Sequence, residues 1–119
     1  MNYNGKVVTL CGSRKFLKTM MQTRDMLIDH KALVFMPDSI NVPDFGEMNK
    51  EQIDAIHAVH EFKMESSDVV LFINENGYMG DDTKRELAFC VSHDIPIELL
   101  HDEYKAEDYL NDFDNEDAI

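Results

Sequence analysis

The chain has 119 residues, 44% of them hydrophobic, and its 24 acidic and 11 basic residues give a formal net charge of −13. This length and apolar fraction indicate one globular domain, and the acidic excess argues against a nucleic acid partner because it repels phosphate backbones. No apolar run approaches the roughly 20 residues that span a bilayer, and MNYNGKVVTL lacks the features of a signal peptide, so we expect a cytoplasmic protein without a membrane partner.

The first half of the chain predicts two strands and two helices in alternation. Residues 6–10 (KVVTL) form a β-branched apolar run that predicts a buried strand, followed by a Cys-Gly-Ser turn. Residues 15–29 place apolar side chains at helical spacing. Residues 32–36 (ALVFM) predict a second buried strand, which a proline stops. A long loop over 37–49 then leads into a helix over 50–65.

The second half repeats this alternation. Residues 68–74 (DVVLFIN) predict the strongest strand, and the glycine loop ENGYMG follows it. A helix over 82–93 leads to a strand over 96–100, and a weak acidic helix is predicted over 106–113. Strands that alternate with helices, and that are apolar throughout, predict a doubly wound α/β fold with four to five parallel strands and helices on both faces.

This fold predicts where a ligand would bind. We assign residues 1–103 to the α/β domain and 104–119 to an acidic, weakly helical tail. In doubly wound sheets, ligands gather beyond the carboxyl ends of the strands, where the strand order reverses. We therefore expect the loops at 11–15, 37–49 and 75–83 to lie together at that edge.

The turn after the first strand has two interpretations. Gly12 and Ser13 stand between a strand and a helix, where free backbone N–H groups and the helix dipole can hold an anion, and Arg14 and Lys15 would add positive charge. Alternatively, this is a plain turn with Ser13 as the helix N-cap. The turn matches neither the three-glycine dinucleotide fingerprint nor the P-loop pattern.

The segment GYMGDDTKRE also has two interpretations. Thr83 and Glu86 fit the T-x-x-E capping box, in which the glutamate reaches back to the backbone of the cap residue. Alternatively, the helix dipole keeps Glu86 ionised at the ligand edge, as a glycosyl-accepting nucleophile requires. Gly77 and Gly80 let the backbone approach a ligand, while Tyr78 offers either a stacking ring or a loop anchor.

Histidines and cysteines do not indicate a metal centre. His57 and His60 lie three residues apart on one helix, but no third ligand is identifiable. We expect His60 to be a polar contact near the ligand edge, or a surface or half-buried residue. Cys11 and Cys90 lie inside apolar runs without ligand spacing and are expected to be buried free thiols. We predict neither a metal nor another cofactor.

Three stretches, KVVTLCGSRKF, HEFKMESSDVVLFIN and NGYMGDDTKRELAFCVSHDIPI, resemble the nucleoside 2-deoxyribosyltransferase-like superfamily. That superfamily includes 2'-deoxynucleoside 5'-phosphate N-hydrolases, and the likeness is greatest to its short bacterial and phage members. It covers roughly residues 6–100. The resemblance implies that Glu86 attacks the anomeric carbon of a nucleoside or its 5'-monophosphate. It also implies that substrate is bound by the loop after the first strand and by the glycine loop, which contain Gly12, Ser13, Arg14, Gly77, Tyr78, Gly80 and Thr83.

The implied chemistry is a retaining displacement, in which a second acid protonates the departing base. Asp82 is our candidate, with Asp81 and His60 as alternatives. Transferases of the superfamily commonly carry an aspartate six residues before the glutamate, where this chain has Gly80. Hydrolysis, or ligand binding by a non-catalytic nucleotide-sensing module, is therefore favoured over base exchange. The resemblance also implies a homo-oligomer.

Overall fold

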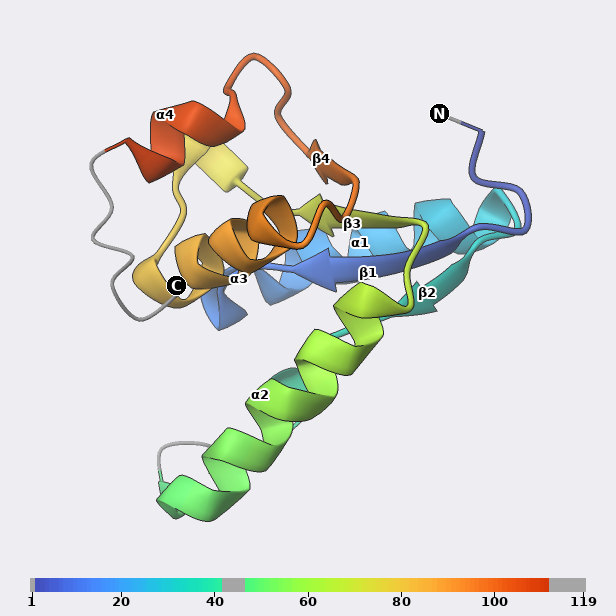
Figure 1. Cartoon of the computed structure of the whole chain (residues 1–119). Helices are drawn as coiled ribbons and strands as arrows, with labels where there is room; N and C mark the ends of the chain where they lie inside the picture. Colours follow the sequence, from blue (N-terminus) through green and yellow to red (C-terminus); the bar gives the residue numbers. More distant parts are fainter. Residues whose placement is uncertain (1, 42–46, 112–119) are drawn as a thin grey trace.

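A computed structural model describes residues 2–41 and 47–111 of the chain. Its described residues form one sheet of four parallel strands in the order β2-β1-β3-β4 (Figure 1). The α/β fold and parallel sheet expected from the sequence are thus confirmed. The strands are β1 (Val7–Cys11), β2 (Leu33–Phe35), β3 (Val69–Phe72) and β4 (Ile97–Leu99).

The predicted helices all form, with small differences at their ends. The helix expected from residue 15 begins as a 3-10 turn, and its α-helical part starts at Leu17. Over the described residues, no helix combines the length and the apolarity needed to cross a membrane. The α-helices are α1 (Leu17–Asp29), α2 (Lys50–Glu65), α3 (Asp81–Ser92) and α4 (Ala106–Leu110), and the 3-10 helices include η1 (Arg14–Phe16), η2 (Asp38–Asn41) and η4 (Glu75–Gly77).

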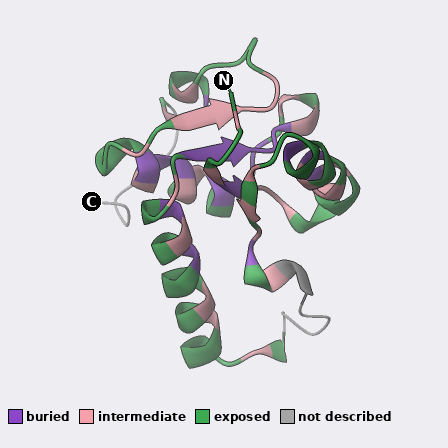
Figure 2. Cartoon of the chain, turned by 90° about the vertical axis from the view of Figure 1, so that its right-hand side faces the viewer, coloured by how far each residue is buried: buried purple, intermediate pink, exposed green. Residues whose placement is uncertain are grey.

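Side chains alternate between two cores, one on each face of the sheet, because successive residues of a strand point to opposite sides. On one face Val8 and Leu10 pack with residues of α1. On the other face Cys11 packs with Met64 of α2 and with Cys90 of α3. Strands β1 and β3 lie in the middle of the sheet and are the most buried elements, as Figure 2 shows.

Strand β2 corrects one expectation. The sequence predicts a buried strand, but Leu33 is 56% exposed and Phe35 is 38% exposed. The physical reason is position, because β2 lies at the edge of the sheet and pairs with β1 alone. A run of apolar residues does not distinguish an edge strand from a central one.

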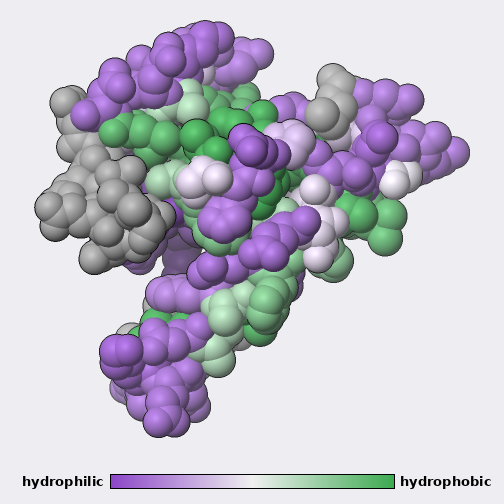
Figure 3. Space-filling model, viewed as in Figure 1, coloured by the Kyte–Doolittle hydropathy of each residue, from purple (hydrophilic) through white to green (hydrophobic). Residues whose placement is uncertain are grey.

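Helix α2 extends well beyond the sheet (Figures 1 and 2). Only His60 and Met64, in its C-terminal half, are buried. The projecting N-terminal turns are strongly hydrophilic in Figure 3, and Asn49 begins the helix with a capping box that includes Gln52. The part of α2 that carries chemistry is therefore the part that packs on the strands.

The segment after β4 folds back onto α3 through α4. Tyr109 of α4 is 7% exposed and donates a hydrogen bond to the Gly77 carbonyl at 3.0 Å. The same hydroxyl accepts one from buried Asn74, whose amide also bonds both backbone groups of His101. These contacts tie α4 to the loop after β3. The helix ends at Leu110 with Asn111 as its C-cap, and residues 112–113 of the predicted helix lie outside the described residues.

Candidate functional site

A cleft of about 990 Å³ opens at the carboxyl edge of the sheet. The strand order reverses between β1 and β3, and loops following β1, β2 and β3 all reach the cleft, together with α2 and α3. This is the place where doubly wound folds bind ligands. Nine of the ten residues predicted for the site line it, namely Gly12, Ser13, Arg14, His60, Tyr78, Gly80, Asp82, Thr83 and Glu86.

The start of α3 rules out the capping-box interpretation of Glu86. The N-cap is Gly80, so Thr83 is the third residue of the helix and Glu86 the sixth. Thr83 is 4% exposed inside the helix and makes no cap. The dipole argument also fails for Glu86, because that effect is confined to the first turn, which holds Asp81 and Asp82 instead.

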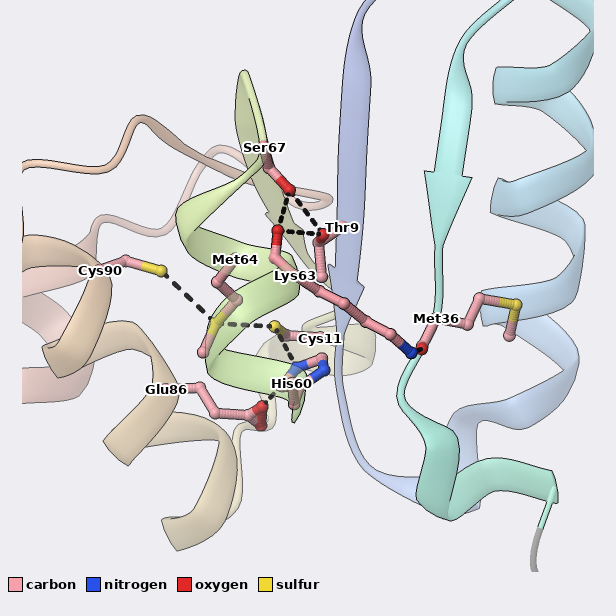
Figure 4. A network of polar contacts seen from close by, with 9 residues as sticks. All are labelled: Thr9, Cys11, Met36, His60, Lys63, Met64, Ser67, Glu86 and Cys90. Carbon is pink, nitrogen blue, oxygen red and sulfur yellow. Dashed lines mark hydrogen bonds and ion pairs between the residues drawn. The ribbon is translucent and has the colours of Figure 1, made fainter. Parts of the chain in front are cut away.

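The Glu86 carboxylate contacts a histidine and lies near a thiol, both from other elements (Figure 4). Its Oε2 lies 2.9 Å from Nε2 of His60, and the same Nε2 lies 3.2 Å from Sγ of Cys11. The side chain of His60 is only 7% exposed, and that of Glu86 is 24% exposed. Residues of β1, α2 and α3 thus converge at the cleft, and we call them the Cys11–His60–Glu86 cluster.

Glu86 and Cys11 both lie at Nε2 of His60, which can carry only one proton. A neutral imidazole carries a single N–H, and a carboxylate is a stronger acceptor than a thiol, so we assign the Nε2 proton of His60 to Glu86. The other ring nitrogen, Nδ1, is buried without a partner among the described residues. An N–H at Nδ1 would therefore have no acceptor among the described residues.

Cys11 is not arranged as a nucleophile. Burial, reinforced by the negative charge of Glu86, raises its pKa well above the usual range, so it stays a thiol. In a Cys-His-carboxylate triad the two partners bind opposite ring nitrogens, whereas here both lie at Nε2. Cys11 and Cys90 are both buried and free, as the sequence predicted.

The loop after β1 follows the plain-turn interpretation and still faces the cleft. The Ser13 hydroxyl accepts the backbone N–H of Lys15 at 3.3 Å and so caps η1. Gly12 packs tightly, since an added Cβ would lie 3.0 Å from Cβ of Ile73. Arg14 lines the same cleft. The anion-binding interpretation remains a prediction.

Tyr78 is anchored at the rim of the cleft. Nζ of Lys15 lies 3.3 Å from the centre of its ring, and Phe16 packs edge-on at 5.7 Å between ring centroids. These contacts fit a loop anchor, but Tyr78 is 45% exposed, and its role as a stacking ring stays a prediction. Its hydroxyl also lies 3.2 Å from the position that a Cβ on Gly80 would take, so a side chain there would press on Tyr78.

Three other residues considered in the sequence are not members of the cluster. Asp82 is exposed and pairs with Arg85. His57 is exposed on the wall of the cleft. Gly77, the tenth predicted site residue, is not among the lining residues; its φ of +76° forms the turn after β3, under Tyr104.

Sequence reasoning missed the part that Cys11 plays. The alternation of β1 places Thr9 and Cys11 on one face, but no local pattern tells which helix covers that face. Nor does the spacing of His60 point to a partner 49 residues away. Comparisons with family models, with curated proteins and with solved structures find no matching protein.

Proposed function

We propose that this protein cleaves the N-glycosidic bond of nucleosides, or of their 5'-monophosphates, with Glu86 as the nucleophile and deoxyribose as the expected sugar. One observation carries the proposal: a partly exposed carboxylate lies at the cleft, and a buried histidine N–H holds one of its oxygens. That bond engages Oε2, and in this proposal the other oxygen, Oε1, attacks the substrate. A cleft of about 990 Å³ is large enough for a nucleotide.

The proposed reaction has two displacements at the anomeric carbon. First, Oε1 of Glu86 forms a bond to that carbon while the bond to the base breaks, and the base leaves with the electron pair and takes up a proton. Water then attacks the same carbon and gives its proton to the acid that protonated the base, while the bond from the carbon to Oε1 breaks, which releases the sugar and restores the Glu86 carboxylate. His60 donates to Oε2 throughout, which fixes the direction of the attacking oxygen.

The remaining residues of the cleft have supporting roles in this proposal. Backbone N–H groups at Gly12 and Ser13, with the charge of Arg14, would bind a 5'-phosphate. The N–H of His60 is engaged with Glu86, so a different group must protonate the base. In this proposal it is a carboxyl group in the first turn of α3. Asp81 and Asp82 both line the cleft, and Asp82 is our first choice from the sequence.

We also propose that the protein acts in the cytoplasm as a homo-oligomer. Phe62 of α2 is 63% exposed, Val59 of the same helix is 41% exposed, and Leu33 of the edge strand β2 is 56% exposed. Exposed apolar side chains of this kind favour association between copies. Light scattering at several protein concentrations would test it, and a monomer at every concentration would contradict it.

Glu86→Gln tests the nucleophile. Wild type and variant are incubated with a panel of deoxynucleosides and their monophosphates, and free base is measured by chromatography. We expect base release to fall on the order of 10³-fold or more, because an amide cannot form the ester intermediate. Glu61→Gln, an exposed glutamate on the wall of the same cleft, is the matched control and should retain activity. Base release at the wild-type rate by Glu86→Gln would disprove the assignment.

A second candidate is a binding module that senses or sequesters a nucleotide without chemistry. It is favoured by Gly80, which stands where transferases of the superfamily commonly carry an aspartate. Titration calorimetry with the same panel separates the two functions. Heat of binding without any free base supports the module, whereas free base supports the enzyme.

A further inference from the structure

We propose that Cys11, His60 and Glu86 bind a divalent cation of the Zn²⁺ type, with the fourth coordination position open to the cleft. The sulfur, imidazole nitrogen and carboxylate oxygen of these residues all lie within 4.8 Å of one another. They come from three separate elements, so the arrangement depends on the complete fold. Metal binding at this cluster does not depend on the proposed glycosidase activity.

The distances need little change to admit the ion. Ligand atoms at about 2.0–2.3 Å from a tetrahedral zinc lie roughly 3.3–3.7 Å from one another. In the protein, Nε2 of His60 lies 3.2 Å from Sγ of Cys11 and 2.9 Å from Oε2 of Glu86. These two contacts would open by a few tenths of an ångström. The third distance, from the Cys11 sulfur to the Glu86 oxygen, lies within 4.8 Å and can be adjusted by Glu86, which at 24% exposure is the least confined of the three side chains.

The donor set selects the class of cation. A thiol and an imidazole are poor ligands for Mg²⁺ and Ca²⁺ but good ones for Zn²⁺ and Co²⁺. Binding releases the thiol proton of Cys11 to solvent, and the resulting thiolate and carboxylate then balance the two positive charges of the ion. A neutral centre can be accommodated beside a buried strand, where an unbalanced charge would be costly.

The surroundings of His60 indicate reversible binding. Coordination through Nε2 moves the ring proton to Nδ1, which has no hydrogen-bond partner among the described residues. In resident zinc sites that second nitrogen is almost always held by a partner. We therefore infer an ion that enters and leaves the cleft. If the proposed function is also correct, the ion occupies the nucleophile and competes with the substrate.

The test measures metal binding without a substrate. The full chain, freed of metal with a chelator, is titrated with Co²⁺, and the thiolate-to-cobalt absorption band is recorded; Zn²⁺ should then displace one equivalent of Co²⁺. We expect Cys11→Ser to remove the band and Glu86→Gln to weaken Co²⁺ binding at least about tenfold. Glu86 is partly exposed, so its substitution keeps the test valid if the Cys11 variant does not fold.

Two control variants distinguish this site from adventitious binding. Cys90→Ser changes the other buried thiol, which contacts the same Met64 sulfur at 3.7 Å, and His57→Ala changes the exposed histidine of the cleft. Both should bind Co²⁺ as the wild type does. Absence of the band in the wild type, or equal binding by wild type and Glu86→Gln, would overturn the inference. If Glu86→Gln loses base release but the wild type binds no Co²⁺, only the metal inference is overturned and the proposed function stands.

Discussion

Thr9 and Cys11 stand two residues apart on one face of β1, against the same helix α2, and yet they have opposite surroundings (Figure 4). The Thr9 hydroxyl lies 2.6 Å from that of Ser67 and 3.2 Å from the carbonyl of Lys63. Ser67 in turn donates to that carbonyl at 2.6 Å. This Thr9 cluster consists of the hydroxyls of Thr9 and Ser67 and the backbone carbonyl of Lys63. All three groups are uncharged, and they satisfy one another's hydrogen bonds.

One helical turn earlier in α2, the Cys11–His60–Glu86 cluster contains polar groups whose hydrogen bonds its members do not all satisfy. A single N–H lies between a thiol and a carboxylate, and the carboxylate is partly exposed at the cleft. Groups that satisfy one another contribute stability, whereas groups with unused capacity at a cleft are available to a ligand. Substitutions in the Thr9 cluster should therefore change stability, and those in the Cys11–His60–Glu86 cluster should change activity.

Next to the Glu86→Gln variant described above, the largest effect should come from His60→Leu. It removes the N–H that holds Glu86, and we expect base release to fall about 100-fold, the usual loss when one positioned donor is removed. His60→Gln keeps an N–H donor and should recover part of the rate. Kinetics of base release for the two variants provide the measurement. Equal rates for the Leu and Gln variants would show that the N–H of His60 does not contribute to base release.

A smaller effect should appear as a change in stability at alkaline pH. Burial, with a further contribution from the charge of Glu86, raises the pKa of Cys90 from 9.0 to about 12. Above pH 9 the unfolded chain loses this proton while the folded chain keeps it. The free energy of unfolding should therefore fall by up to about 1.4 kcal/mol per pH unit from this group, between pH 9 and 12.

Cys90→Ala isolates that contribution. Urea denaturation of wild type and variant at several pH values gives the two stability curves, and the wild type should lose stability more steeply. Parallel curves would mean that the thiol titrates alike in both states. Cys90 is a useful reference for Cys11. Both thiols contact the Met64 sulfur, but Cys90 is not a member of the Cys11–His60–Glu86 cluster.

The smallest effect should come from Thr9→Val, which removes a buried hydroxyl and keeps the shape of the side chain. We expect a loss of about 1 kcal/mol in the free energy of unfolding, with base release unchanged. A double-mutant cycle with Ser67→Ala measures how far the two hydroxyls depend on each other. A Thr9→Val variant that is fully stable but inactive would reverse the roles assigned to the two clusters.

Much of the fold is predictable because it depends on local patterns. Each strand is an apolar run bounded by turn residues, and the helix over 50–65 was predicted with the bounds that the structure gives it. The exposure of β2 could not be predicted in this way, because strand order depends on contacts between distant segments. The start of α3 was predicted to within one residue, at 82 instead of Asp81, but the T-x-x-E capping box at Thr83 was a wrong alternative because Gly80 is the N-cap.

The site was predictable as an edge of the sheet but not as a set of contacts. Glycine loops after strands locate the cleft, and Glu86 and His60 were both placed there from the sequence. That they bind one another, and that Cys11 joins them, depends on how α2 and α3 lie across the sheet. Because the three side chains come from three separate elements, no spacing in the sequence indicates that they meet.

The assembly of the site from β1, α2 and α3 also offers a way to search for its natural ligand. In the unfolded chain these three donor groups are separated, so a molecule that requires all of them binds the native state alone. Mass action then raises the unfolding free energy, by about 2.7 kcal/mol when the ligand is present at one hundred times its dissociation constant. A melting curve recorded across a metabolite library would reveal such a molecule before any reaction is known.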